Sequence, residues 1–391
     1  MLIGIEAERA NNPQKTGVEH YAKELILHLA ELDKINSYIL YLRSKPEDWF
    51  KSLPANFQVK AIPFPIFWTQ IRISLEMLFS PVDVLFIPAS ALPLIHPKKS
   101  VVTIHDIGWR YFPRSFTWFM RNFLEWSTKF AVRNAAGIIA VSESTKKDLI
   151  KFYRIEANRV SVVHHGYEIG KPAKPTSPDP SRSAPASTNS SLGGQDEADA
   201  SQGGSESQSS GTDLPNKYIL FLSTLQPRKN LEGLINAFKQ LKIENPELPH
   251  KLVVVGKTGW KFESILKTIA ENKDVIYLNY VSDKDRFAIL TKANMLVLPS
   301  FYEGFGMQIL ESFQAGVPVA TSNVSSMPEV AGHAALYFDP KNITEIKNAM
   351  KLILTDKSLA DNLRAMGKER LKDFSWEKCA RETLGVLIKI N

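Results

Sequence analysis

The hydrophobic pattern along the chain switches repeatedly between short apolar runs and longer segments of helical spacing. In the first half, short apolar runs bounded by turn residues predict buried strands. Between them, apolar residues recur at the three- and four-residue spacing of helices, for example from Val18 to Leu32. Strands that alternate with helices in this way favour a parallel sheet, so the first half reads as an α/β domain. The predicted strands of this half lie at 2–5, 38–42, 83–87, 101–104, 137–141 and 160–163.

The second half repeats this rhythm and predicts a second domain. Apolar runs at 218–222, 251–257, 275–282, 293–300 and 316–321 predict its strands, and a last helix is predicted from Trp376 to Ile390. A chain of 391 residues exceeds the size at which one core usually stops growing, which also favours two domains. Between the halves, residues 171–213 are rich in Ser, Pro and Gly, almost lack large apolar side chains, and are predicted to be disordered. We therefore expect domains at 1–170 and 214–375, joined by the linker 171–213 and followed by the terminal helix 376–391.

The stretch from Phe301 to Phe313 carries the most informative chemistry. It predicts a strand end, a loop containing Gly304 and Gly306, and a helix from Met307. The unbonded N–H groups of a first helical turn favour an anion such as a diphosphate. Glu303 in the loop and Glu311 in the helix offer carboxylates to sugar hydroxyls. On these residues alone, an alternative is equally open, in which Glu303 is an ordinary loop charge and Glu311 lies on a solvated helix face.

The passage from 301 to 330 resembles the C-terminal domain of retaining glycosyltransferases of family 4. The E-x7-E signature of that family stands here as Glu303 and Glu311. The resemblance extends over nearly the whole chain. It implies the GT-B fold, in which two Rossmann-like parallel-sheet domains face each other across a cleft and the last helix returns to the N-terminal domain.

Four further positions gain a role from this resemblance. Arg228 and Lys229 precede a predicted helix, where two cations are poorly placed for the helix dipole unless they serve an anion. They read either as exposed charges or, by resemblance, as ligands of the donor diphosphate. His105 follows a strand and reads either as a structural histidine or, by resemblance, as a contact of the donor sugar. Gly17 reads either as a plain turn or as part of a loop that closes over the diphosphate.

The resemblance thus implies two groups of site residues. The catalytic group is Glu303, His105, Arg228 and Lys229. The donor-binding group is Gly17, Arg228, Lys229, Gly304, Phe305, Gly306, Met307 and Glu311.

The implied reaction is transfer of a sugar, with retention of configuration, from a nucleoside diphosphate to an acceptor hydroxyl on a glycan or a lipid-linked glycan. General likeness to bacterial polysaccharide mannosyltransferases makes GDP-mannose the first expectation for the donor. No cofactor and no metal ion are expected. Two other classes stay open: a non-catalytic protein that binds sugar nucleotides, and a GT-B phosphorylase or epimerase.

Composition bears on the partners and the cellular location of the protein rather than on its chemistry. The chain is 44% hydrophobic and 23% charged, with a formal charge of +7, which suits an anionic ligand or an anionic membrane surface. It shows no basic module that would indicate nucleic acid. With a single cysteine, no secretory leader pattern and no apolar run of spanning length, we expect a cytoplasmic protein.

Two aromatic-rich stretches leave a further question open. Residues 62–79 and the basic amphipathic segment 118–132 combine Trp, Phe, Ile and Leu with Arg and Lys. Packing into the core is the preferred reading for both. Contact with lipid, at the inner face of a membrane, is the alternative.

Overall fold

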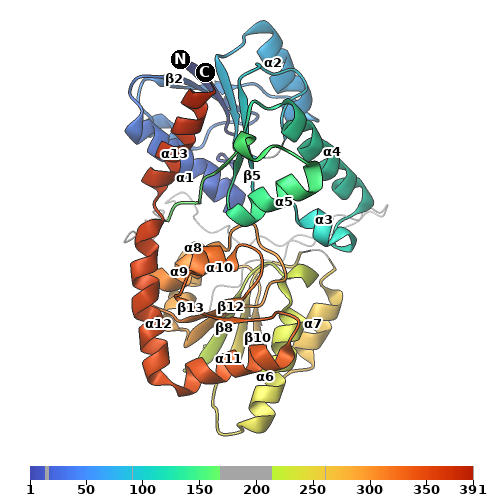
Figure 1. The fold of residues 1–391 in the computed structure, drawn as a ribbon, viewed down its shortest axis with the longest axis vertical. Helices are drawn as coiled ribbons and strands as arrows, with labels where there is room; N and C mark the ends of the chain where they lie inside the picture. Colours follow the sequence, from blue (N-terminus) through green and yellow to red (C-terminus); the bar gives the residue numbers. More distant parts are fainter. Residues whose placement is uncertain (14–16, 90, 168–213, 260, 391) are drawn as a thin grey trace, which may run out of the picture.

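The computed structural model describes residues 1–13, 17–89, 91–167, 214–259 and 261–390. The linker predicted at 171–213 lies outside these residues. In the described part, two parallel sheets with helices on both faces lie one above the other (Figure 1). This confirms the predicted class of two parallel-sheet α/β domains.

The N-terminal sheet has seven strands in the order β3-β2-β1-β4-β5-β6-β7, all parallel. The apolar runs predicted six of them, because strands buried on both faces carry continuous apolar side chains. The seventh, β3, escaped prediction because it is an edge strand in which only Phe57 is fully buried. The strands are β1 (Leu2–Glu6), β2 (Ser37–Leu42), β3 (Phe57–Ala61), β4 (Val84–Ile87), β5 (Ser100–Ile104), β6 (Gly137–Ala140) and β7 (Val160–Val162).

Helices cover both faces of this sheet. One face packs against α1 (Gly17–Leu32) and the last helix of the chain, α13 (Trp376–Lys389). The other face packs against α2 (Ser74–Phe79), α4 (Trp118–Asn134) and α5 (Glu143–Tyr153). The short turns of this domain are η1 (Asp48–Ser52), η2 (Thr69–Ile73), α3 (Gly108–Tyr111), η3 (Pro113–Ser115) and η4 (Ala157–Arg159).

The C-terminal sheet has six parallel strands in the order β10-β9-β8-β11-β12-β13. Its strands are β8 (Tyr218–Leu222), β9 (Lys251–Val255), β10 (Val275–Leu278), β11 (Met295–Leu298), β12 (Val319–Ser322) and β13 (Ala335–Phe338). Its helices are η5 (Pro227–Lys229), α6 (Leu231–Glu244), α7 (Glu263–Ala270), α8 (Asp283–Lys292), α9 (Met307–Gln314), α10 (Met327–Ala331), α11 (Ile343–Thr355), α12 (Lys357–Arg370) and η6 (Leu371–Asp373). Helices α8, α9 and α10 pack on one face, and α6, α7, α11 and α12 on the other.

Both sheets have the doubly wound strand order, with the chain reversing direction beside β1 in one and β8 in the other. In such sheets ligands bind beyond the carboxyl ends of the strands at this reversal. The strand order therefore places the candidate site where the loops after β1, β4, β8 and β11 converge.

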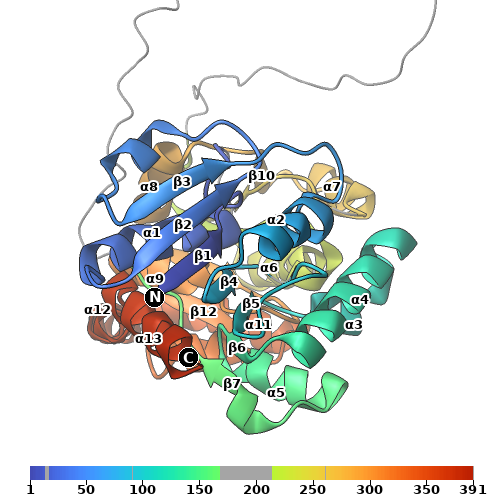
Figure 2. The same ribbon diagram turned by 90° about the horizontal axis from the view of Figure 1, so that it is seen from above.

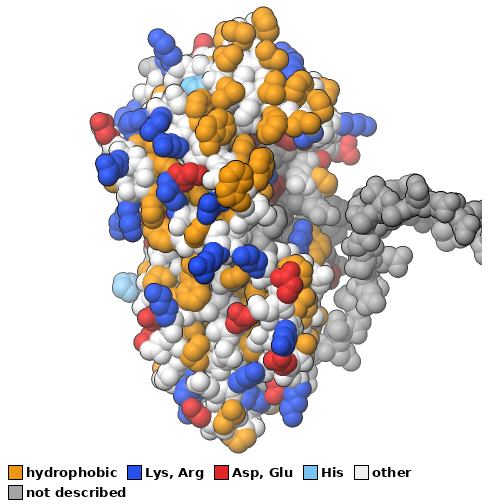
Figure 3. All heavy atoms as spheres, turned by 90° about the vertical axis from the view of Figure 1, so that its right-hand side faces the viewer, with side chains coloured by type: hydrophobic (Ala, Val, Ile, Leu, Met, Phe, Trp, Pro, Cys, Tyr) orange, Lys and Arg blue, Asp and Glu red, His pale blue; other side chains and the backbone are white. Residues whose placement is uncertain are grey.

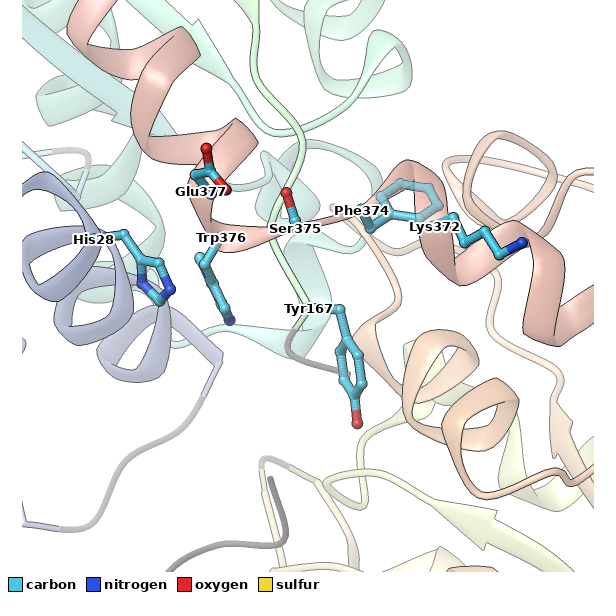
Figure 4. Close-up of a pocket in the computed structure, with 7 residues that line it drawn as sticks. All are labelled: His28, Tyr167, Lys372, Phe374, Ser375, Trp376 and Glu377. Carbon is cyan, nitrogen blue, oxygen red and sulfur yellow. The ribbon is translucent and has the colours of Figure 1, made fainter. Parts of the chain in front are cut away.

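The last helix returns to the N-terminal domain, where α13 lies beside α1 and the two chain ends come close together (Figures 1 and 2). The chain crosses between the domains at residues 163–167 and again at 374–376. The crossings touch at Gly166, where a Cβ atom would lie 2.3 Å from the backbone of Trp376. A hollow of about 230 Å³ lies at this crossing. Figure 4 shows Tyr167, Phe374 and Trp376 among the residues that line it.

The aromatic stretch 62–79 is divided between core and surface. Trp68, Ile73 and Met77 are buried, as the preferred reading expected. Phe67 and Phe79, in contrast, are 53% and 77% exposed. None of the helices in the described part of the chain is long and apolar enough to cross a bilayer.

Candidate functional site

The core of the site is a buried ion pair between residues that follow two adjacent strands of the C-terminal sheet, β8 and β11. Lys229 ends η5 after β8, and Glu303 lies in the loop after β11. The Lys229 Nζ atom lies 2.5 and 2.6 Å from the two Glu303 carboxylate oxygens, and both residues are at least 94% buried, with 5% and 6% exposure. The sequence separates these residues by 74 positions, and the sheet brings them together.

Electrostatics keep this pair charged. Burial, together with the positive charge of Arg228, lowers the pKa of Lys229 to about 8. Burial acts to raise the pKa of Glu303, but Lys229 and Arg228 outweigh it and lower the pKa below its ordinary value. The Ser300 hydroxyl also donates to Glu303, at 2.7 Å. At neutral pH the site thus holds a carboxylate and two cations in little water.

Arg228 and two serines fix the backbone of the loop that carries Glu303. The Arg228 guanidinium donates to the Tyr302 carbonyl at 3.0 Å and lies 3.6 Å from the Glu303 carboxylate. The hydroxyls of Ser325 and Ser326, at the turn before α10, donate to the Glu303 carbonyl at 2.6 and 3.0 Å. These contacts hold the loop in place without a ligand, which favours precise positioning of whatever binds at Glu303.

Gly304 lies where the two domains meet. A Cβ atom at this position would lie 2.0 Å from the His105 carbonyl oxygen. The Ser142 hydroxyl, at the start of α5, donates to the Gly304 carbonyl at 2.7 Å. Glycine is needed at 304 because the N-terminal domain backbone approaches too closely for any side chain.

His105 follows β5, as predicted, but both of its ring nitrogens contact protein atoms. Nε2 lies 2.8 Å from the Pro88 carbonyl, which can only accept, so Nε2 carries the proton. Nδ1 then accepts from His165 Nε2, at 3.3 Å. Burial lowers the pKa of both histidines, and that of His165 falls well below the ordinary value. In this closed arrangement His105 is neutral and presents its backbone carbonyl, not a free ring nitrogen, to the Glu303 loop.

Glu311 lies apart from this ion pair, in α9. Its Oε1 atom accepts from Arg286 of α8 at 2.9 Å. Its Oε2 atom is buried and has no hydrogen-bond partner among the residues that the structure describes. A buried carboxylate oxygen without a donor is unusual in a folded protein and indicates a place for a ligand hydroxyl.

The remaining predicted residues lie at or just before the N-termini of two helices, α1 and α9. Gly306 precedes α9 with a φ of +96°, a backbone conformation that glycine tolerates best. Phe305 is buried and stacks on His165 of the domain crossing, with ring centroids 4.8 Å apart. Met307 begins α9. Gly17 begins α1, and a Cβ atom there would meet nothing within 4 Å, so packing alone does not require glycine.

Sequence reasoning missed a set of contacts that hold the domains together. Tyr302 donates to Asp148 of α5 at 2.9 Å and accepts from the Ile107 backbone at 3.3 Å. Glu329 of α10 accepts from the backbone N–H groups of Glu143 and Ser144 at the start of α5, and lies 2.7 Å from His164. Only one local signal pointed to them, since Glu329 is an acidic residue with no Lys or Arg within four positions of it in the sequence.

In the described ranges, no group of three or more His, Cys, Asp or Glu side chains could hold a metal ion. Arg228 and Lys229 both place a cation within 4 Å of the Glu303 carboxylate. The hollow at the domain crossing is lined by other residues, and neither Lys229 nor Glu303 is among them.

Comparison with known families matches both halves of the chain. The family model described as "Glycosyltransferase Family 4" matches residues 15–171, and that described as "Glycosyl transferases group 1" matches residues 204–370. O-antigen chain mannosyltransferase B of Escherichia coli is 30% identical over 290 residues, which cover 73% of this chain and 69% of that protein. The chain belongs to glycosyltransferase family 4. These matches confirm the resemblance that Glu303 and Glu311 suggested for this transferase.

Solved structures agree on the fold. Sucrose-phosphate synthase from Thermosynechococcus elongatus superposes with a TM-score of 0.71 at 16% identity, covering 100% of the transferase and 98% of that chain. Anabaena HepE, solved in complex with UDP-glucose, superposes with a TM-score of 0.65 at 14% identity, covering 99% of both chains. The transferase has the GT-B fold, as the resemblance implied.

Proposed function

We propose that this transferase moves a mannosyl group from GDP-mannose to a hydroxyl of a glycan or lipid-linked glycan, with retention of anomeric configuration. The observation that carries the proposal is the buried Lys229–Glu303 pair with Arg228 beside it, at the sheet reversal where α/β proteins bind ligands. The choice of mannose rests on the 30% identical Escherichia coli mannosyltransferase.

Each charged group has a task in this reaction. Breaking the glycosidic bond places negative charge on the leaving diphosphate, and Arg228 and Lys229 stabilise it. The first N–H groups of α9, after Gly306, add to this stabilisation. Glu303 accepts from the hydroxyls of the transferred sugar and fixes the position of its anomeric carbon.

Glu311 holds the other end of the donor. Its unpartnered Oε2 atom accepts from a ribose hydroxyl, while Arg286 keeps the carboxylate in place. His105 and Gly17 face the donor from the N-terminal domain, His105 through its backbone in the closed state. The acceptor hydroxyl attacks on the face from which the diphosphate leaves, and the leaving phosphate takes its proton. No cofactor and no metal ion take part in this scheme.

We place the reaction in the cytoplasm. The single cysteine, Cys379, is buried and unpaired. A free cysteine without a disulfide framework suits a reducing compartment.

A panel of nucleotide sugars tests the proposal. GDP-mannose is expected to raise the melting temperature more than GDP-glucose, UDP-glucose or UDP-galactose, and to release GDP when a mannose-terminated acceptor is added. NMR of the product is expected to show an α-mannoside, the configuration of the donor. A thermal shift without GDP release on any acceptor would indicate a binding protein. Release of mannose 1-phosphate upon addition of inorganic phosphate would indicate a phosphorylase.

A further inference from the structure

The N-terminal domain carries an exposed apolar surface that the sugar-transfer site does not use. Its most exposed members on α4 are Trp118 at 74% and Phe119 at 65%, and Phe67 of the neighbouring segment is 53% exposed. Figure 3 shows hydrophobic side chains gathered over the N-terminal domain on this face of the molecule. Large contiguous apolar surfaces are uncommon on proteins that meet only water.

A groove of about 490 Å³ runs between these side chains. Apolar side chains supply almost all of its lining, from three separate segments of the chain. Phe67, Ile71, Leu94, Trp118, Phe123 and Trp126 are among them. The lining of this apolar groove includes no charged side chain and only two polar ones, Gln70 and Asn122, which suits a hydrocarbon chain better than a sugar.

One polar atom in the apolar groove lacks a partner. Gln70 is 92% buried, since only 8% of it is exposed, and it lines the groove. Its Nε2 atom is buried and makes no hydrogen bond within the described structure. A buried amide donor of this kind fits a ligand that brings an acceptor oxygen next to a hydrocarbon chain.

The exposed face of α4 that carries the aromatic side chains also carries two cations further along the helix. Helical geometry places Trp118, Asn122, Trp126, Lys129 and Arg133 in one stripe, because they are three or four residues apart. The opposite side of the helix is the buried one. The stripe therefore passes from aromatic side chains to positive charges, and Lys129 and Arg133 are both exposed.

We propose that the apolar groove and the α4 stripe dock on a bilayer surface rich in anionic phospholipid. One acyl chain occupies the groove, an ester carbonyl of that lipid accepts from Gln70, and Lys129 and Arg133 bind neighbouring phosphates. An aromatic face with a cationic end is the composition of helices that lie in the membrane interface.

The position of this surface relative to the site supports the inference. The chain leads from His105 through α3 directly into α4. Phe112, in that connection, stacks on Phe301 of the Glu303 loop with ring centroids 6.2 Å apart. A protein docked in this way holds its transfer site close to the membrane, where a lipid-linked acceptor would be found.

Vesicle co-sedimentation of the full chain tests this inference. We expect binding to vesicles of phosphatidylcholine mixed with phosphatidylglycerol, weaker binding to phosphatidylcholine alone, and a decrease with added salt. The W118S/F119S variant is expected to bind more than about a hundredfold more weakly, because two aromatic side chains no longer leave water. The K129Q/R133Q variant is expected to lose about thirtyfold on anionic vesicles and almost nothing on neutral ones.

The control variant I35S/I243S changes two apolar residues that are 92% and 80% exposed elsewhere on the molecule. It is expected to bind vesicles like the wild type. GDP release with a water-soluble acceptor is expected to stay unchanged in all of these variants, so failure of the docking surface and failure of the transfer reaction are told apart.

Two results would overturn the inference. One is wild-type protein that stays in the supernatant with anionic vesicles, or W118S/F119S protein that sediments like the wild type. The other is a wild-type dimer that W118S/F119S converts to a monomer in sedimentation velocity, since a second copy would then cover this face.

Discussion

Lys229 carries a charge at a position that is almost fully enclosed by protein. Removing its ammonium group in Lys229→Ala leaves the Glu303 carboxylate buried with Ser300 and Arg228 as its remaining partners. Breaking a buried pair costs about 3–5 kcal/mol of folding free energy, and these partners keep the loss near the lower figure. We expect a lower melting temperature and donor binding weakened by about 1.5–3 kcal/mol, measured by calorimetric titration with GDP. Lys239→Ala, at an exposed position of α6, is the matched control and should change neither quantity.

The two glutamates of the E-x7-E pair should fail in different ways. In the proposed reaction Glu311 binds the ribose, so for Glu311→Gln we expect roughly tenfold weaker binding of both GDP and donor. Glu303 binds the transferred sugar in the same proposal, so for Glu303→Gln kcat should fall about a hundredfold while GDP binds nearly normally. Steady-state kinetics with varied donor, together with GDP titrations, separate the two effects. Wild-type binding and turnover in both variants would reduce the pair to a structural role.

Buried histidines give the protein a pH-dependent stability. Because burial lowers the pKa of His165 in the folded state, the unfolded chain binds the extra proton first as the pH falls below about 6.5. The stability contributed by neutral His165 is therefore complete above this pH and decreases below it, by at most about 1.4 kcal/mol per pH unit. His165→Gln keeps an amide donor for His105 Nδ1 but cannot titrate, so its unfolding free energy should fall less steeply between pH 6.5 and 5.

Glu6 is the control for that experiment because it acts in the opposite direction. Burial raises its pKa to about 7, so the folded state holds a proton that the unfolded state has lost between about pH 4.5 and 7. Its contribution to stability is present at low pH and decreases as the pH rises through 7. Glu6→Gln should therefore steepen the acid-side loss of stability, whereas His165→Gln should flatten it. Parallel profiles for His165→Gln and the wild type would show that His165 is not the titrating group.

At the scale of elements, the loop between β11 and α9 depends on one close approach between domains. In Gly304→Ala the new methyl group would overlap the His105 carbonyl, so the closed arrangement cannot form without a shift of backbone. We expect a loss of turnover of about a hundredfold with GDP binding retained, because the diphosphate ligands lie in the C-terminal domain. The radius of gyration from small-angle scattering should increase.

Gly385→Ala provides the comparison, since a Cβ atom there would meet nothing within 4 Å and the position lies inside α13. That variant should be active and more stable by up to about 1 kcal/mol. A fully active Gly304→Ala protein would mean that the closed arrangement is not the reactive one.

At the scale of the whole molecule, the connection between the domains is predicted to be dispensable. Tyr167 and Leu214, on either side of residues 168–213, both pack against the same core of the C-terminal domain. Replacing 175–210 by a short Gly/Ser segment should leave melting temperature and turnover close to those of the wild type, because Leu192 is the one large apolar side chain among the removed residues. A melting temperature several degrees lower, or lost activity, would show that the segment contributes to the fold or to the reaction.

Local patterns were sufficient for much of this protein. Buried parallel strands carry continuous apolar side chains, so their positions and the α/β class follow from the sequence. The loop glycines and the spacing of Glu303 and Glu311 indicated the family and the region of the site. The edge strand β3 was missed because a strand covered on one side only lacks such a run.

Only the tertiary structure decided which distant residues meet. The Lys229–Glu303 pair, the His105–His165 contact and the approach of Gly304 to His105 join residues 60 to about 200 positions apart. No local pattern encodes such contacts, because they depend on strand order and on the packing of one domain against the other. The same holds for the aromatic residues of 62–79 and α4. Their helical spacing could be read from the sequence, but whether a given ring faces the core or solvent depends on which neighbouring elements cover it.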